Sequence, residues 1–332
     1  MSFSSPLSPA LGDEATGLTR EEYKIKALDG TEMSLWRIAT RSAAATETPK
    51  PALLHISSSL SSIREVMRVG GGNMDLDTLN RVIIDGLGTK PLHDTGIVLL
   101  TVMARPGQPS PFSGPVADVY AAYEYAVTHA DDLRIQPHNI AMSGQYTSGQ
   151  FVWSATHIAI ELGLPAPCGV MVLNPDLNPE VNWETKLGHW ERILGFETGS
   201  LTRLDEQRER AVHDWLKTNW DVALRRIDFT LFPDIVRKYT GLLQLPREDL
   251  SRLPPMFVDV GYYWNRCREV RQARAMLAEA GVEVFGFDQQ PIEFEQFMQG
   301  DPGWYRVHNG TRLVQEKRWE SKRQFFQKIW KN

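Results

Sequence analysis

The sequence predicts an α/β fold: a mostly parallel central sheet with helices on both faces and a helical insertion over the sheet. Apolar runs of strand length alternate along the chain with segments of helical spacing, the pattern of β-α-β units. The runs are continuously apolar rather than alternating, as expected for strands that are buried on both faces. Residues 176–250 break this rhythm with helical patterns and many aromatic residues but no good strand.

The elements justify this prediction in chain order. We expect the Ser- and Pro-rich residues 1–20 to be a flexible lead-in, residues 21–39 to form a hairpin around Asp29-Gly30, and residues 40–50 to be an exposed loop. The other strands are expected at 52–56, 96–102, 140–142, 169–173, 256–260 and 282–287. Helices are expected at 74–86, 115–130, 149–163, 267–280 and 311–330. The predicted core therefore comprises residues 21–175 and 251–332, and residues 176–250 form a cap.

Composition narrows the function classes. The 332 residues carry a net charge of −5 and their Lys and Arg do not cluster, so neither a nucleic-acid partner nor an anionic membrane surface is expected. No apolar run approaches the ~18 residues of a membrane span, and the N-terminus does not read as a signal peptide. Two cysteines far apart in sequence, Cys168 and Cys267, fit a reducing compartment. We expect a cytoplasmic protein with a small-molecule partner, and leave open whether it forms a homodimer.

The most informative motif is the stretch around residues 139–151. An apolar strand (Ile140 to Met142) runs into Gly144-Gln145-Tyr146-Thr147-Ser148-Gly149, and a helical pattern follows. Strand, tight turn and helix form the setting of a nucleophile elbow, G-x-S-x-G, in which the corner residue is a serine. Here the corner residue is Tyr146. A phenol is a poor acyl-transfer nucleophile but a competent proton donor.

Several further landmarks stand in a recognisable order. They are His55-Ile56-Ser57-Ser58-Ser59 after a strand, 105–112 before a helix with Asp118, 134–141 before the elbow, Asn174-Pro175, 253–255 and 278–282. This order resembles the α/β-hydrolase fold, specifically the hormone-sensitive-lipase-like carboxylesterase group, over about residues 50–300. The resemblance implies a catalytic pocket at the carboxyl ends of the strands, beneath a helical cap.

The functional positions of that group are substituted in this sequence. Tyr146 stands at the position of the nucleophile, Trp264 at that of the acid, and Glu295 at that of the histidine. The glycines of the H-G-G-G oxyanion loop are replaced by Ile56, Ser57 and Ser58. Because all three triad positions and the oxyanion loop depart together, the resemblance implies the scaffold of a hydrolase without its Ser-His-Asp triad.

A shifted serine could in principle restore hydrolysis. Ser143 and Ser148 flank the corner, but neither has glycines at both −2 and +2, which the close approach of strand and helix requires. Among the histidines only His308 follows the last predicted strand, and it lies well past the expected position. We therefore favour chemistry without a serine nucleophile.

The leading hypothesis is a lyase, isomerase or cyclase that needs no cofactor and acts on a hydrophobic, oxygenated small molecule, such as a natural-product biosynthetic intermediate. Tyr146 would donate a proton or hydrogen bond, and Glu295, with Glu293 as the second carboxylate, would be the opposing base. The other expected contacts are aromatic packing by Trp264 and Tyr263, backbone N–H groups of Ser57, Ser58 and Thr147, and lining of the pocket by Ser148. No residues show the spacing of metal ligands, and Gly70-Gly71-Gly72 lacks the pattern of a phosphate or dinucleotide loop.

Two alternatives belong to other classes. One is a binding protein that kept the pocket and lost the chemistry. The other is an esterase with a relocated nucleophile. An enzyme of the leading type should lose turnover on Tyr146→Phe or Glu295→Gln while retaining ligand, whereas a binding protein should tolerate both changes.

Overall fold

The structure is a computed structural model, and it describes residues 17–28, 30–57, 95–103, 113–145, 147–173, 175, 177, 238–239, 241–259, 267–287 and 312–330. The described strands form one eight-stranded sheet in the order β1-β2-β4-β3-β5-β6-β7-β8. Their bounds are Leu18–Lys26 (β1), Glu32–Thr40 (β2), Lys50–Ser57 (β3), Val98–Met103 (β4), Ile135–Gln145 (β5), Gly169–Leu173 (β6), Met256–Asp259 (β7) and Val284–Phe285 (β8).

The sheet confirms the predicted α/β class. β1 and β2 form the expected antiparallel hairpin, β2 pairs antiparallel with β4, and the pairs from β4 through β3, β5, β6 and β7 to β8 are parallel. β5 lies between β3 and β6, so the strand that leads into the expected elbow is central. In parallel sheets of this kind ligands bind beyond the carboxyl ends of the central strands.

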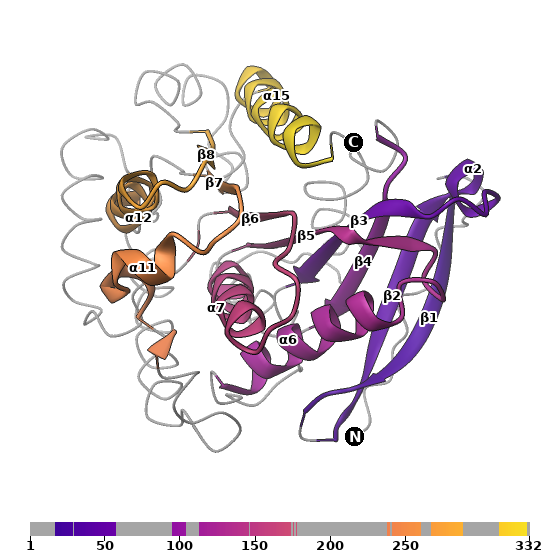
Figure 1. The fold of residues 1–332 in the computed structure, drawn as a ribbon. Helices are drawn as coiled ribbons and strands as arrows, with labels where there is room; N and C mark the ends of the chain where they lie inside the picture. The colour runs from indigo at the N-terminus through magenta and orange to yellow at the C-terminus, as the bar shows by residue number, and fades with distance from the viewer. Residues whose placement is uncertain are drawn as a thin grey trace, which may run out of the picture.

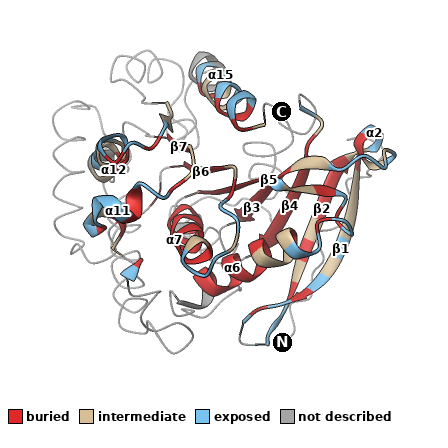
Figure 2. Ribbon diagram, in the orientation of Figure 1, coloured by how far each residue is buried: buried red, intermediate tan, exposed pale blue. Residues whose placement is uncertain are grey.

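Helices cover the two faces of the sheet, as Figures 1 and 2 show. Side chains of α6 (Ser113–Thr128), α7 (Thr147–Glu161) and α12 (Cys267–Glu279) pack into one large apolar core against one face. The opposite face packs against α15 (Arg312–Ile329), through Phe325, Phe326 and Ile329. Because successive strand residues point to opposite faces, the continuous apolar runs of the sequence supply both cores.

Three elements show the clearest differences from those expected. The stretch at 40–50, expected to be a loop, contains α2 (Arg41–Ala44), because the Thr40 hydroxyl accepts a hydrogen bond from the Ala43 N–H and Ala43 is buried. β5 begins at Ile135 rather than 140. Its first residues are mostly polar, and its pairing with β3 shifts in register between Lys50 and Ala52. β8 is shorter than predicted. The helix expected at 74–86 lies outside the described residues.

The last part of the predicted cap, from residue 238 on, packs against the core through a buried anchor. The rings of His157 and Tyr239 stack at 4.6 Å, and the Trp153 Nε1–H donates to His157 Nε2 over 3.1 Å. The Ser154 hydroxyl donates to the backbone carbonyl of Tyr239 over 2.8 Å. η2 (Leu242–Gln244) and α11 (Arg247–Leu250) follow. Residues 1–16 and 178–237, which hold most of the predicted lead-in and cap, lie outside the described part.

Candidate functional site

The corner between β5 and α7 has the tight geometry that an elbow requires. β5 ends at Gln145 and α7 begins at Thr147, so one residue separates strand from helix. A Cβ atom added to Gly144 would lie 2.4 Å from the backbone oxygen of Ser148, and one added to Gly149 would lie 3.1 Å from Cβ of Pro175. A β-carbon at residue 144 has no room because strand and helix approach each other so closely.

Most of the predicted site residues lie outside the described part of the chain. These are Tyr146, Glu295, Glu293, Trp264, Tyr263, Ser58 and His308. Ser57 and Thr147 are described in backbone only, as the last residue of β3 and the first of α7. The expected pairing of Tyr146 with Glu295 therefore stays a prediction.

The serines that flank the corner are both inside the protein. Ser148 is 1% exposed in the first turn of α7, and Ser143 is 0% exposed within β5. Ser143 faces the α15 side of the sheet, because it alternates with Ala141 of that core. A substrate cannot reach a hydroxyl in that position, which argues against Ser143 as a relocated nucleophile.

The end of β3 corrects the expected start of the oxyanion loop. Ile56 pairs with Val102 and Gly144 inside the sheet and is 1% exposed, and Ser57 still pairs with Met103. Both residues therefore belong to the strand, and any loop begins after them. Strand β3 therefore extends further along the chain than the motif suggested, because Ile56 and Ser57 are still paired with neighbouring strands.

A buried Ser–His pair joins the two strand ends that meet at the site. The imidazole Nδ1 of His55 lies 2.9 Å from Oγ of Ser143, across the parallel pair of β3 and β5. Burial, and then the nearby charge of Lys322, lower the pKa of His55 to about 4, so the ring is neutral at pH 7. The sequence analysis missed this pair. The signal was available, since His55 has the same strand parity as Leu53 of the α15-side core.

The same face carries a second set of buried polar groups, where β7 meets α15. Nε of Arg318 lies 3.5 Å from Oδ2 of Asp259, and the two side chains are 9% and 4% exposed. Asp259 Oδ1 and His55 Nε2 have no hydrogen-bond partner within the described part. The half-buried Lys322 follows one turn after Arg318; burial lowers its pKa to about 8, while Asp259 opposes that shift. We call His55, Ser143, Asp259, Arg318 and Lys322 the α15 polar cluster.

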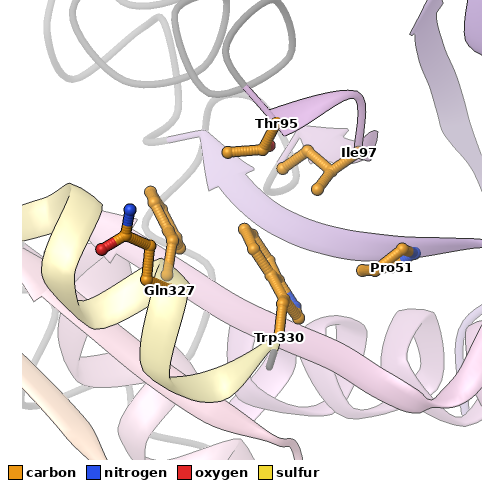
Figure 3. A pocket seen from close by; sticks show the side chains of 6 residues that line it. Pro51, Thr95, Ile97, Gln327 and Trp330 are labelled. Atoms are coloured by element: carbon orange, nitrogen blue, oxygen red, sulfur yellow. The ribbon is translucent and has the colours of Figure 1, made fainter. Parts of the chain in front are cut away.

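One described cavity lies away from the elbow. It has a volume of about 470 Å³ and is lined by Pro51, Thr95, Ile97, Phe326, Gln327 and Trp330. Figure 3 shows Trp330 reaching from α15 toward Ile97, with Pro51 on the neighbouring strand. Pro51 is the second residue of β3 and Ile97 precedes β4, so the cavity lies at the amino ends of the strands, opposite the elbow.

The described ranges hold neither a candidate metal centre nor a candidate membrane-spanning helix. No group of three or more His, Cys, Asp or Glu side chains there could hold a metal ion. No helix in that part of the chain is long and apolar enough to cross a membrane.

Comparison with known proteins agrees with this geometry. The chain matches the model of a family described as alpha/beta hydrolase fold over residues 70–292, more than half of its length. No curated protein is significantly similar in sequence.

Solved structures of similar fold include esterases. An esterase from the fungus Rhizomucor miehei has a TM-score of 0.63 at 16% identity, covering 100% of this chain and 93% of its own. A bacterial heroin esterase has a TM-score of 0.62 at 18% identity, covering 96% and 89%. An esterase of the bacterial hormone-sensitive lipase family has a TM-score of 0.60 at 17% identity, covering 98% and 87%. At these identities the structures show a common fold. With the family match and the parallel sheet, they establish that the chain belongs to the alpha/beta hydrolase fold family.

Proposed function

We propose that this member of the family is a cofactor-free enzyme that performs acid–base chemistry without hydrolysis. Its reaction would be that of a lyase, isomerase or cyclase on a hydrophobic, oxygenated small molecule, such as a biosynthetic intermediate. Tyr146 would donate a proton or hydrogen bond to a substrate oxygen, and Glu295 would remove a proton.

The observation that carries the proposal is the corner at residues 144–149. The close approach of Gly144 to the backbone of Ser148, and of Gly149 to Pro175, retains the tight strand-to-helix turn. The single residue between β5 and α7 is nevertheless tyrosine. A fold that keeps the tight turn but replaces the nucleophile is better explained by a different reaction than by the loss of hydrolase activity.

The residue types suit this chemistry. A phenol has an ordinary pKa of about 10 and is a proton donor at neutral pH. A carboxylate among aromatic groups, as Glu295 would be beside Phe294, Phe297 and Trp264, gains a raised pKa by desolvation and so approaches the range of a general base. Together they can enolise a ketone: the carboxylate takes the α-proton while the phenol hydrogen-bonds to the developing enolate oxygen.

The test is exchange of α-protons in D₂O, followed by proton NMR with 2-tetralone as a flat, hydrophobic ketone probe. The wild-type protein should accelerate exchange above buffer. Glu295→Gln and Tyr146→Phe should each reduce that acceleration about 10²-fold or more, the usual contribution of a positioned acid or base. Both variants should still bind the ketone, because they keep the shape of the pocket.

Other outcomes identify the alternatives. Binding of 2-tetralone without exchange, unaltered by either substitution, would support a catalytically inactive binding protein and overturn the proposal. Release of nitrophenol from 4-nitrophenyl acetate, with labelling by a serine-directed phosphonate that Ser148→Ala abolishes, would instead identify an esterase with a relocated nucleophile. Ser143→Ala is the matched control, because that hydroxyl is buried in the sheet and bonded to His55.

A further inference from the structure

A short segment leads from the predicted cap back to the core, and its polar contacts are made with one helix. We define the return segment as Lys238, Tyr239 and residues 241–253. Within the described residues, the side-chain hydrogen bonds and ion pairs that join this segment to another element all end on α7. α7 begins directly after the corner. The corner and the return segment are therefore attached to the two ends of one helix.

Three donors of the return segment converge on Oε2 of Glu161, the last residue of α7. The Tyr239 hydroxyl donates to it over 3.0 Å and Nη1 of Arg252 over 2.9 Å, and Nζ of Lys238 lies 3.8 Å away. A carboxylate at the C-terminal end of a helix faces the negative end of the helix dipole. Glu161 is therefore unfavourable where it stands unless cations accompany it, and the return segment supplies two.

Arg252 also completes the end of α7. Its Nη2 donates to the carbonyl oxygen of Ile160 over 3.3 Å, and the last four carbonyls of a helix have no partner N–H within that helix. The chain that follows α7 closes the same end, because the Gly163 N–H donates to Ile160 and the Leu164 N–H donates to Ala159. The last turn of α7 is thus held partly by its own continuation and partly by a residue about 90 positions later.

A buried stack carries the contact further into α7. His157 is 2% exposed, and its ring lies parallel to that of Tyr239 with 4.6 Å between centroids. The Ser154 hydroxyl, which is also buried, donates to the backbone carbonyl of Tyr239 over 2.8 Å. Withdrawal of Tyr239 would remove the acceptor of Ser154 and expose one face of the imidazole. The return segment therefore cannot leave its place without disturbing residues 154–161.

We propose that the return segment and the last two turns of α7 open and close as one cooperative unit, so that a displacement of this segment is transmitted to the helix that begins at the corner. Proteins open locally in contiguous units of this kind, and coupling is carried by packed and hydrogen-bonded groups. Here the contacts run without a break from Arg252 through Glu161 and Tyr239 to His157. The inference does not depend on the reaction that the protein performs.

The experiment is hydrogen–deuterium exchange of the full chain at pH 7, read by mass spectrometry in peptides that cover residues 154–164 and 241–253. Arg252→Met alters only the return segment, and Glu161→Gln alters only α7. Each substitution should raise the exchange rate in both regions about fivefold, since exposed charge pairs contribute modestly. The two substitutions together should raise it by less than the product of their separate effects, because they remove the two partners of one interaction.

Arg323→Met is the matched control. The side chains of Arg252 and Arg323 are 43% and 44% exposed, and Arg323 also donates to a carboxylate, that of Glu320, over 2.8 Å. Both members of this second pair lie on α15. Its loss should therefore leave exchange in residues 154–164 and 241–253 unchanged.

Four results would overturn the inference. They are a rise confined to the region that carries the substitution, no rise in either region, an equal rise throughout the strands of the sheet, or the same rise with Arg323→Met. Thermal unfolding establishes that each variant is folded, and Arg252→Gln replaces Arg252→Met if the latter does not fold. Absence of ketone exchange would contradict the proposed function and leave these outcomes unaffected.

Discussion

On the face covered by α6, α7 and α12, the sheet packs against one broad apolar core, whereas on the α15 face a smaller apolar core lies beside buried polar side chains. The first core contains large side chains from three helices, among them Tyr123, Trp153 and Leu277. The second is smaller, and near the carboxyl edge its members, such as Leu173, lie beside the buried His55, Ser143 and Asp259. The difference indicates that one face mainly supplies stability, while the other gives up apolar burial close to the site.

The sharpest test of the first face is Trp153→Ala. The indole is 1% exposed and donates to His157, so its removal leaves a large cavity and an unpaired ring nitrogen. We expect a loss of about 4 kcal/mol in the free energy of unfolding, measured by urea denaturation. Leu28→Ala, at a side chain that is 38% exposed, is the control and should change it by less than about 0.5 kcal/mol. A loss below about 1 kcal/mol at Trp153 would mean that this core does not dominate stability.

The corner that lies between the two faces is tested by Gly144→Ala. The added Cβ would meet backbone atoms of Ser148, which cannot rotate away, so we expect a cost of about 3 kcal/mol from overpacking. Gly163→Ala is a useful comparison, because Gly163 has a φ of 82° and nothing within 4 Å of the added carbon. It should cost about 1 kcal/mol, from the left-handed conformation alone. Equal losses at the two glycines would contradict the tight corner.

Acid should affect both faces through one histidine on each. Burial lowers the pKa of His55 to about 4 and that of His157 to about 3, from an ordinary value of 6.5. Below pH 6.5 these histidines bind protons in the unfolded chain but stay neutral in the folded protein. The free energy of unfolding therefore decreases as the pH is lowered, until the pH reaches the pKa of each histidine in the folded protein. We expect each histidine to account for about 2 kcal/mol of loss between pH 7 and pH 5. Urea denaturation of His55→Asn and His157→Gln at both pH values should show a smaller loss in each variant; an unchanged loss would refute the assignment.

The smallest effect is expected at Ser143→Ala, on the α15 face. The change removes one neutral hydrogen bond and leaves His55 Nδ1 without its 2.9 Å partner, which should cost about 1–2 kcal/mol. In NMR the imidazole signals of His55 should shift while those of His157 stay in place. If the signals of His55 do not move, the Ser–His pair does not persist in solution.

The sequence predicted the parallel sheet well because its strands are long apolar runs and its helices have clear periodicity. The bounds of β6 agree with those expected, whereas the start of β5 was missed because Gln136 to Asn139 are polar and partly exposed strand residues. The tight corner could be predicted because Gly144 and Gly149 are close in sequence and have the spacing that such a turn requires. The α15 polar cluster could not be found in this way, since it joins residues from about 55 to 322 that only the topology brings together.

The late position of α15 in the chain also has a consequence for biosynthesis. All eight described strands precede Arg312, so the ribosome has made this described part of the sheet before the helix emerges. Until then Leu53, Met171 and Phe257, which α15 buries, would face the solvent of the cell and offer a sticky surface to chaperones or to other nascent chains. Arg318 emerges in the same step as this cover, so its ion pair with Asp259 cannot form before the helix has been made.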